Sequence, residues 1–465
     1  LSRPVNNSVT ALPITSWLDD SGSPVDPYLD GLMVRTGNIQ SVQVGGAIGD
    51  VIAGSGDILV VRANADSMVP LGRFDGIVGN IYGNRIGNVD IGSGLAAPSH
   101  GPLATPSIVA NHDINIITST TPGAYISSLI DAGNINLANA DGDYPTDGIA
   151  SIQLTTGGSY VGAWIGSMTL DDFWDGFFPD GGQFRGTIDR LGGMGANLLK
   201  SDVRANLINT IVLTDGYYDA SRTESASDIL RIEAKGYRNS TSQGGEQEFQ
   251  LSQILIGQNL GILTTTGMMG DINDLVLDVL GRTTEISGLN VRRSSFDSDV
   301  SLDMFKVMGN MAGSSITAGR LMMGDFKHNV ASSIISISGP MEMVMVGDAI
   351  INSSLNVTGP DGRMGMVKAR TGFSGSVTAA GPIDTIEVTE GDLDIRITTF
   401  ANQHGDPGNI KTLKASRDLV LRTDIGGTVD EFIAGRNIGR IGDPGVILVH
   451  GTVKKVDVPN GQLYS

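Results

Sequence analysis

The chain has no cysteine among its 465 residues, and this absence removes three kinds of chemistry. It excludes disulfide bonds, thiol nucleophiles and cysteine-ligated metals. The chain also lacks any run of about 18 apolar residues, so we expect no helix that inserts into a membrane. Aromatic residues account for only 5% of the chain, which indicates a narrow core filled by aliphatic side chains.

Basic residues are scarce relative to acidic ones. The sequence holds 31 lysines and arginines against 50 aspartates and glutamates, for a formal charge of −19. Nucleic acids and anionic membrane surfaces are bound through basic patches, so the charge argues against both as partners. It remains compatible with binding of cations.

Glycine is abundant, with 64 residues, and much of it belongs to a recurring phrase. A small polar residue precedes an aliphatic one, and further aliphatics alternate until the next glycine, as in residues 37–45, 56–61, 132–137, 339–347 and 381–388. A period near 20 residues with strand-like alternation indicates a β-solenoid with one coil per repeat. We therefore predict an all-β fold, a single right-handed parallel β-helix with loop insertions, the hand following the general bias of parallel crossovers. Repeats of this length predict roughly 16 to 20 coils.

Asparagine or aspartate often precedes the first aliphatic residue of the phrase. This holds for Ile39, Ile58, Ile81, Ile114 and Ile135, and we expect them to share one inward column. Asn and Asp tolerate left-handed turns, and stacked Asn side chains can form ladders between coils. Glycine is expected at corners that need a positive φ.

The repeat divides the chain into four segments. Residues 1–36 lack it and are expected to cover the first coil as a clasp. Residues 37–159 form coils, residues 160–185 form an aromatic and acidic loop insertion, and residues 186–465 continue the coils.

The insertion contains seven of the 24 phenylalanine, tyrosine and tryptophan residues of the chain. A subunit contact, a sugar-stacking surface and packing on the solenoid itself are all consistent with this composition. The candidate interface or glycan-binding residues are Trp17, Trp164, Phe173, Trp174, Phe177 and Phe178.

Four carboxylates accompany these aromatics: Asp171, Asp172, Asp175 and Asp180. Glycosidases need two carboxylates placed across one sugar, so a polysaccharide lyase or hydrolase is an alternative. The Asn-Thr-Asp and Arg-Ile-Lys phrases of pectinase-type hydrolases are absent. We favour an acidic turn around a hydrophobic plug, and predict no catalytic residue.

One acidic turn has the oxygen-rich composition that suits a calcium ion. Asp141, Asp143 and Asp147 alternate along a glycine-containing segment, and they are the candidate metal ligands. The final glutamate of an EF-hand is missing, and a solvated turn is the other interpretation. No cofactor is required by the sequence.

The phrase G-N-I-x-x-I-x-V-x-G-x-I resembles the glycine-rich parallel β-helix repeats of large secreted bacterial surface proteins, of planctomycete or autotransporter-like adhesin type. The matching stretches are residues 37–61, 133–137, 339–358, 381–397 and 435–458. The resemblance implies an extracellular or cell-surface protein, usually non-catalytic. The first residue is Leu1 rather than methionine, which favours removal of a leader and export, or a fragment of a longer chain.

The end of the repeat suggests self-assembly. The phrase runs to Val458, and the seven residues that follow are too few for a polar cap. We expect a head-to-tail homopolymer, a surface fibre or matrix, in which residues 1–36 clasp a neighbouring copy. A glycan-binding adhesin that recognises surface polysaccharide is the alternative.

Overall fold

The structure, a computed structural model, confirms an all-β parallel solenoid. It describes residues 7–10, 29–44, 47–63, 76–77, 79–95, 106–119, 121, 124–132, 148–154, 159–161, 163–166, 187–193, 197–199, 201–205, 207–219, 222–225, 227–237, 252–440, 442 and 445–464. The coils number about 15, fewer than expected from the repeat. The chain divides into unit 1 (Leu1–Lys235 and Ser240–Gly257) and unit 2 (Gly236–Asn239 and Gln258–Ser465).

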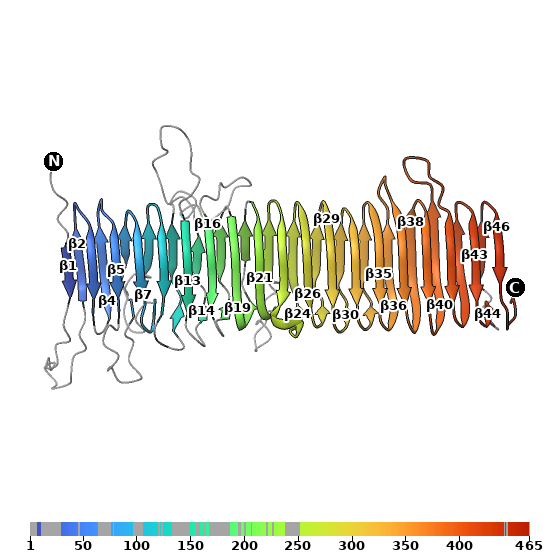
Figure 1. Cartoon of the computed structure of the whole chain (residues 1–465), viewed down its shortest axis with the longest axis horizontal. Coiled ribbons are helices and arrows are strands. Elements are labelled where there is room, and N and C mark those ends of the chain that lie inside the picture. The colour runs from blue at the N-terminus through green and yellow to red at the C-terminus, as the bar shows by residue number, and fades with distance from the viewer. Residues whose placement is uncertain are drawn as a thin grey trace. The chain divides into compact units, whose positions relative to one another are not determined.

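The parallel strands of unit 1 stack one coil upon the next (Figure 1), and their pairings define three faces. Face A consists of β1 (Asn7–Thr10), β3 (Ile39–Gln43), β5 (Ile58–Arg62), β7 (Ile86–Asp90), β10 (Ile114–Thr118), β13 (Gly148–Leu154), β16 (Thr187–Gly193), the first part of β19 (Leu207–Asp219) and β21 (Ile229–Tyr237). Face B consists of β2 (Leu29–Val34), β4 (Ile48–Ala53), β6 (Ile81–Gly83), β9 (Ser107–Ala110), β12 (Leu129–Ala132), β15 (Trp164–Gly166), β18 (Asp202–Ala205), β20 (Arg222–Ser225) and β22 (Ser252–Ile256). Face C consists of β8 (Gly94–Leu95), β11 (Tyr125–Ile126), β14 (Ser159–Val161), β17 (Asn197–Leu199) and the end of β19.

Unit 2 is built in the same manner and has its own three faces. Its face A consists of β23 (Leu260–Thr265), β26 (Arg282–Gly288), β29 (Ser301–Val307), β32 (Leu321–Phe326), β35 (Pro340–Val346), β37 (Arg363–Ala369), β39 (Ile383–Val388), β41 (Ile410–Ala415), β43 (Val429–Ala434) and β46 (Val453–Asp457). Its face B consists of β25 (Leu275–Val279), β28 (Ser295–Ser298), β31 (Ser315–Ala318), β34 (Ile334–Ile337), β36 (Ala349–Val357), β38 (Gly372–Ala380), β40 (Asp392–Phe400), β42 (Asp418–Ile425) and β45 (Val446–Val449). Its face C consists of β24 (Ile272–Asn273), β27 (Val291–Arg292), β30 (Met311–Ala312), β33 (Val330–Ala331), the first residues of β36, β38, β40 and β42, and β44 (Asn437–Ile438). The 3₁₀ turn η2 (Thr266–Met268) lies between β23 and β24.

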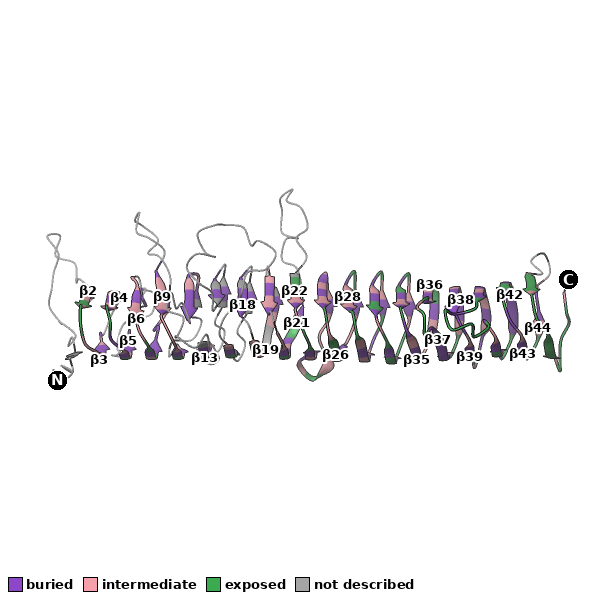
Figure 2. Cartoon of the chain, turned by 90° about the horizontal axis from the view of Figure 1, so that it is seen from above, coloured by how far each residue is buried: buried purple, intermediate pink, exposed green. Residues whose placement is uncertain are grey.

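The core consists of columns of buried residues, one from each coil. Figure 2 shows buried residues along the strands. On face A of unit 1 the column joins Ile39, Ile58, Ile86, Ile114, Ile149 and Ile188. The prediction that Ile81 belongs to this column is wrong, because Ile81 begins β6 and pairs with Val51 on face B. Each coil has more than one strand that begins with a polar residue followed by an aliphatic one, so spacing alone cannot assign such a residue to a face. Ile135 lies outside the described residues.

Stacked asparagines form the ladder that the sequence predicts. In unit 2 the Asn290 amide donates to Asp271 Oδ1 at 2.8 Å, and the backbone N–H of Asn310 donates to Asn290 Oδ1 at 2.9 Å. Asn329 then donates its backbone N–H to Asn310 Oδ1 at 3.1 Å. Each side chain therefore binds the coil next to its own.

A second ladder is buried, and it was not predicted from the sequence. The corner between faces C and B has a column of residues with positive φ: Asp274, Arg293, Gly313, Ser332 and Asn352. Only one of these five is a glycine, so glycine is not the general solution at this corner. The next residue in four of the five coils is a serine at most 4% exposed: Ser294, Ser314, Ser333 and Ser353. Each hydroxyl accepts a backbone N–H from the preceding coil, so the corner has no orphaned donor there.

Methionine occupies both sides of the sheet. Met311, Met341 and Met364 are buried in the core. Four others stand in register on the outer side of face A in unit 2: Met304, Met323, Met343 and Met366.

The described residues contain no helix with the length and apolar character needed to cross a bilayer.

Candidate functional site

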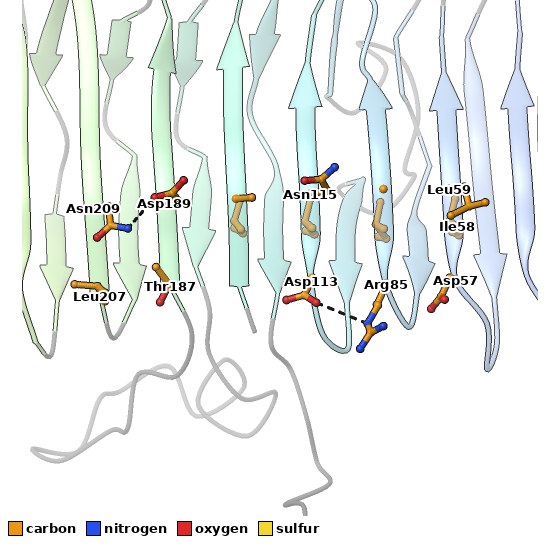
Figure 3. Close-up of a pocket in the computed structure, with 15 residues that line it drawn as sticks. Asp57, Ile58, Leu59, Arg85, Asp113, Asn115, Thr187, Asp189, Leu207 and Asn209 are labelled. Atoms are coloured by element: carbon orange, nitrogen blue, oxygen red, sulfur yellow. Dashed lines mark hydrogen bonds and ion pairs between the residues drawn. The ribbon is translucent and has the colours of Figure 1, made fainter. Parts of the chain in front are cut away.

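An open groove runs along face A of unit 1, across the strands β5, β7, β10, β13, β16 and β19 (Figure 3). Its volume is about 810 Å³. At about 4.8 Å between neighbouring strands, the five steps amount to about 24 Å. The groove is therefore long in the direction that crosses the coils, which suits an extended ligand better than a compact one.

The floor of the groove is low because small residues stand among larger ones. Gly87 and Ala150 occupy outward positions whose neighbours on adjacent coils are Leu59 and Asn115. A side chain at Gly87 would collide with the carbonyl oxygen of Leu59, so the backbone itself forms the floor there. The hollow thus follows from the choice of residues at two coils.

One end of the groove carries ionic side chains. Asp57, Arg85 and Asp113 are the residues directly before the inward isoleucine on three successive coils, and they lie in one row (Figure 3). Arg85 Nε lies 3.7 Å from Asp113 Oδ2, and both side chains are exposed. Exposed pairs of this kind contribute at most about 1 kcal/mol each, so these groups remain available to a ligand.

The other end offers amides and hydroxyls. Asn209 Nδ2 donates to Asp189 Oδ1 at 2.7 Å, which holds both side chains upright over β16 and β19. The Thr210 hydroxyl donates to the backbone carbonyl of Asp189 at 3.1 Å. Asn115, in the middle of the groove, receives support from Asn88, whose Oδ1 accepts its amide at 3.3 Å. The groove combines hydrogen-bonding groups with aliphatic patches from Leu59 and Leu207.

The predicted aromatic site is described only at its beginning. Trp164 starts β15, whose backbone pairs with β12 and β18, so this residue lies within a coil strand. Tyr160 is fully buried in β14, and its hydroxyl donates to the carbonyl of Gly192 at 2.9 Å. Burial raises the pKa of Tyr160 far above its usual range. The other candidate residues, Trp17, Phe173, Trp174, Phe177 and Phe178, lie outside the described residues, as do the carboxylates of that segment.

The candidate calcium ligands Asp141, Asp143 and Asp147 also lie outside the described residues. Within the described part of the chain, no group of three or more histidine, aspartate or glutamate side chains could hold a metal ion. The calcium prediction therefore stays a prediction.

The groove was not predicted from the sequence, although part of its pattern is visible there. Charged residues precede Ile58, Ile86 and Ile114, and a small residue follows Ile86 and Ile149. This pattern can be recognised only when the inward isoleucines of face A are assigned correctly, with Ile86 included and Ile81 excluded. Comparisons with known proteins do not extend the assignment: no family model, no curated protein and no solved structure matches the chain.

Proposed function

We propose that the chain is a non-enzymatic structural protein, an extracellular or cell-surface β-solenoid that assembles head-to-tail. The observation that carries the proposal is the use of charged side chains in unit 2, where they join one coil to the next. Arg363 Nη2 lies 2.6 Å from Asp384 Oδ2, and Lys414 Nζ lies 2.7 Å from Glu387 Oε1. In each pair the partner belongs to the adjacent coil of face A.

Further ion pairs repeat this arrangement along unit 2. They join Arg282 to Asp303, Arg293 to Asp274, Arg320 to Glu342, Arg370 to Asp348 and Lys454 to Asp430. Each exposed pair contributes at most about 1 kcal/mol, but a network that spans many coils adds to the stacking of every neighbouring pair. Side chains committed to stacking support a role as a scaffold.

The last coil supports the assembly step. β46 pairs with β43 and β45 pairs with β42, and in the described residues neither strand has a partner on its other side. Apolar side chains gather there: Val446 is 68% exposed, Val456 51% and Leu463 66%, and Figure 2 shows this end as exposed. A parallel strand with one free edge is a template for another strand. At the opposite end of the sequence, β1 and β2 likewise pair with one strand each among the residues that the structure describes, β3 and β4. A second copy is therefore the occupant that we propose for the last coil.

Sedimentation velocity over a range of concentrations tests this step. The unmodified chain is expected to gain mass as its concentration rises, whereas Val456→Asp and Leu463→Asp should remain monomeric. Val300→Asp is the matched control, because Val300 is 60% exposed but lies on an interior coil of unit 2. A chain that stays monomeric throughout, or a control that abolishes association equally, would contradict the proposal.

A second candidate function is binding of a neutral polysaccharide along the groove of unit 1. The observation that favours it is the length of the groove together with its amides, hydroxyls and carboxylates, which are the groups that bind sugar hydroxyls. Ala150→Gln would raise the floor and should abolish retention on a column of neutral polysaccharide. Thr317→Gln, on the outer side of face B in unit 2, is the control and should be retained like the unmodified chain. Equal retention of the Ala150 variant would exclude the groove.

A further inference from the structure

A second hollow lies on face B of unit 2 and is lined mainly by polar residues. Its volume is about 440 Å³, and it opens where β36, β38, β40 and β42 stand side by side. The lining residues share hydroxyl, amide, carboxylate or guanidinium groups, apart from one glycine: Asn352, Ser374, Gly375, Ser376, Asp394, Arg396 and Arg422. We call it the arginine pocket.

The hollow is produced by the backbone. The pairing of β36 with β38 shifts register between Ile350 and Ser353, and Asn352 within this bulge has a φ of 48°. On the next coil Gly375 has a φ of 137°, and a side chain there would collide with the Ser353 carbonyl. A bulge beside a residue without a side chain leaves a depression in an otherwise regular sheet. The pocket is thus a fixed feature of these coils.

Positive charge is concentrated on one wall. Arg396 and Arg422 are direct partners in the register of β40 and β42, and like charges placed opposite each other destabilise a sheet. Arg422 Nη1 donates to Asp394 Oδ1 at 3.1 Å, and Arg440 Nη1 donates to Asp394 Oδ2 at 3.2 Å, so this carboxylate is shared between two guanidinium groups.

Arg396 differs from its neighbours. It is exposed, and within the described part of the chain its guanidinium has no ion pair and no hydrogen bond. An unneutralised guanidinium beside a second one is a site for an oxyanion, since the planar fork binds carboxylates through two hydrogen bonds. Such a site is unexpected in a chain with a formal charge of −19.

The opposite wall presents neutral polar groups. The backbone N–H of Asn352 donates to Ser374 Oγ at 3.1 Å, which leaves the Ser374 hydroxyl proton directed to another acceptor. The Ser376 hydroxyl bonds to that of Ser354 at 2.9 Å and keeps further capacity as an acceptor. A ligand that fits this wall carries hydroxyl groups of its own.

We propose that the arginine pocket binds a uronic acid unit of an acidic saccharide. Arg396 and Arg422 hold the carboxylate, and Ser374, Ser376 and the side-chain amide of Asn352 bond to the sugar hydroxyls. The proposal depends neither on the groove of unit 1 nor on head-to-tail assembly, because all of the residues involved lie on interior coils of unit 2.

Calorimetric titration of the full chain with an oligogalacturonate, at low salt, tests the proposal. We expect saturable binding, and binding at least about tenfold weaker for a neutral oligosaccharide of the same length. Arg396→Gln should weaken oligogalacturonate binding by about tenfold, which corresponds to about 1.4 kcal/mol. Lys411→Gln removes another exposed cation, on face A, and should leave the affinity unchanged.

Ser376→Ala provides a second variant that leaves the charge unaltered and should also weaken binding. Absence of binding to the oligogalacturonate would overturn the proposal. So would an equal loss in the Lys411 variant, because it would indicate general attraction of a polyanion. A sulfated oligosaccharide that binds while the oligogalacturonate does not would overturn the uronic acid assignment.

Discussion

Replacement of Ser333 by alanine should weaken the corner of unit 2 by a predictable amount. Ser333 is 1% exposed, and its hydroxyl accepts the backbone N–H of Ser314 at 3.3 Å while donating to the carbonyl of Ala331 at 2.8 Å. In the variant the Ala331 carbonyl still accepts the N–H of Gly313 at 3.1 Å, whereas the Ser314 N–H loses its partner. One orphaned buried donor costs about 1–3 kcal/mol.

Amide hydrogen exchange measures this loss at the position where it arises. A loss of about 2 kcal/mol corresponds to roughly 30-fold less protection of the Ser314 amide. A local measurement is preferable to a global unfolding curve, because long repeat arrays do not always unfold as one cooperative unit.

Ser336→Ala is the matched control on the same coil. Ser336 points outward, and its hydroxyl accepts the side-chain amide of Asn356 at 3.3 Å, a bond that water can replace. Its effect should stay within about 0.5 kcal/mol. If Ser314 exchanges equally fast in both variants, or at the rate of the unmodified chain, the buried serine ladder does not stabilise the corner.

Three further predictions concern unit 2. Hydrogen bonding from Arg436 lowers the pKa of Asp418, so the pair stabilises the fold above the ordinary carboxyl pKa and loses this contribution as the pH falls through the lowered value. In an NMR titration, Arg436→Gln should raise the pKa of Asp418, and an unchanged pKa would refute the assignment. A side chain at Gly359 would collide with the carbonyl of the preceding coil, so Gly359→Ala should lower the free energy of unfolding in urea by about 1–3 kcal/mol. Gly372→Ala is the control: a side chain there would lie 3.7 Å from its nearest neighbour, so the loss should be less than about 0.5 kcal/mol. Equal losses in the two variants would contradict this account. Phe305 lies between two other buried phenylalanines, with its ring centroid 5.0 Å from that of Phe296 and 5.8 Å from that of Phe326. Phe305→Ala should therefore lower the free energy of unfolding by about 3–5 kcal/mol. A loss below about 1 kcal/mol would show that the core there is not tightly packed.

The fold was predictable from the sequence because each coil of a solenoid repeats the same pattern of residues at a regular interval. Alternating aliphatics and recurrent glycines were sufficient to predict parallel coils, and an asparagine before an aliphatic residue was sufficient to predict the ladder that includes Asn310. The assignment of Ile81 failed because faces A and B begin with the same short phrase. Only the pairing of strands separates them, and pairing depends on loop lengths that differ from coil to coil.

The candidate sites were harder to predict, for a physical reason. The groove of unit 1 depends on which residues become neighbours across coils 20 to 39 residues apart in the chain, such as Thr187 with Leu207 and Ile149 with Ile188. The arginine pocket depends on a bulge at Asn352, and no local sequence motif predicts this bulge. The signals used for site prediction, aromatic clusters and acidic turns, instead selected residues that lie mostly outside the described part of the chain.

Electron microscopy of the purified chain tests the central claim most directly. A structural solenoid that assembles head-to-tail should appear as filaments that lengthen with concentration, and aligned filaments should diffract at about 4.8 Å along their axis, the spacing of stacked strands. Val456→Asp should abolish the filaments and leave the fold of each subunit intact. Separate single particles at every concentration, or filaments that persist in this variant, would contradict the account.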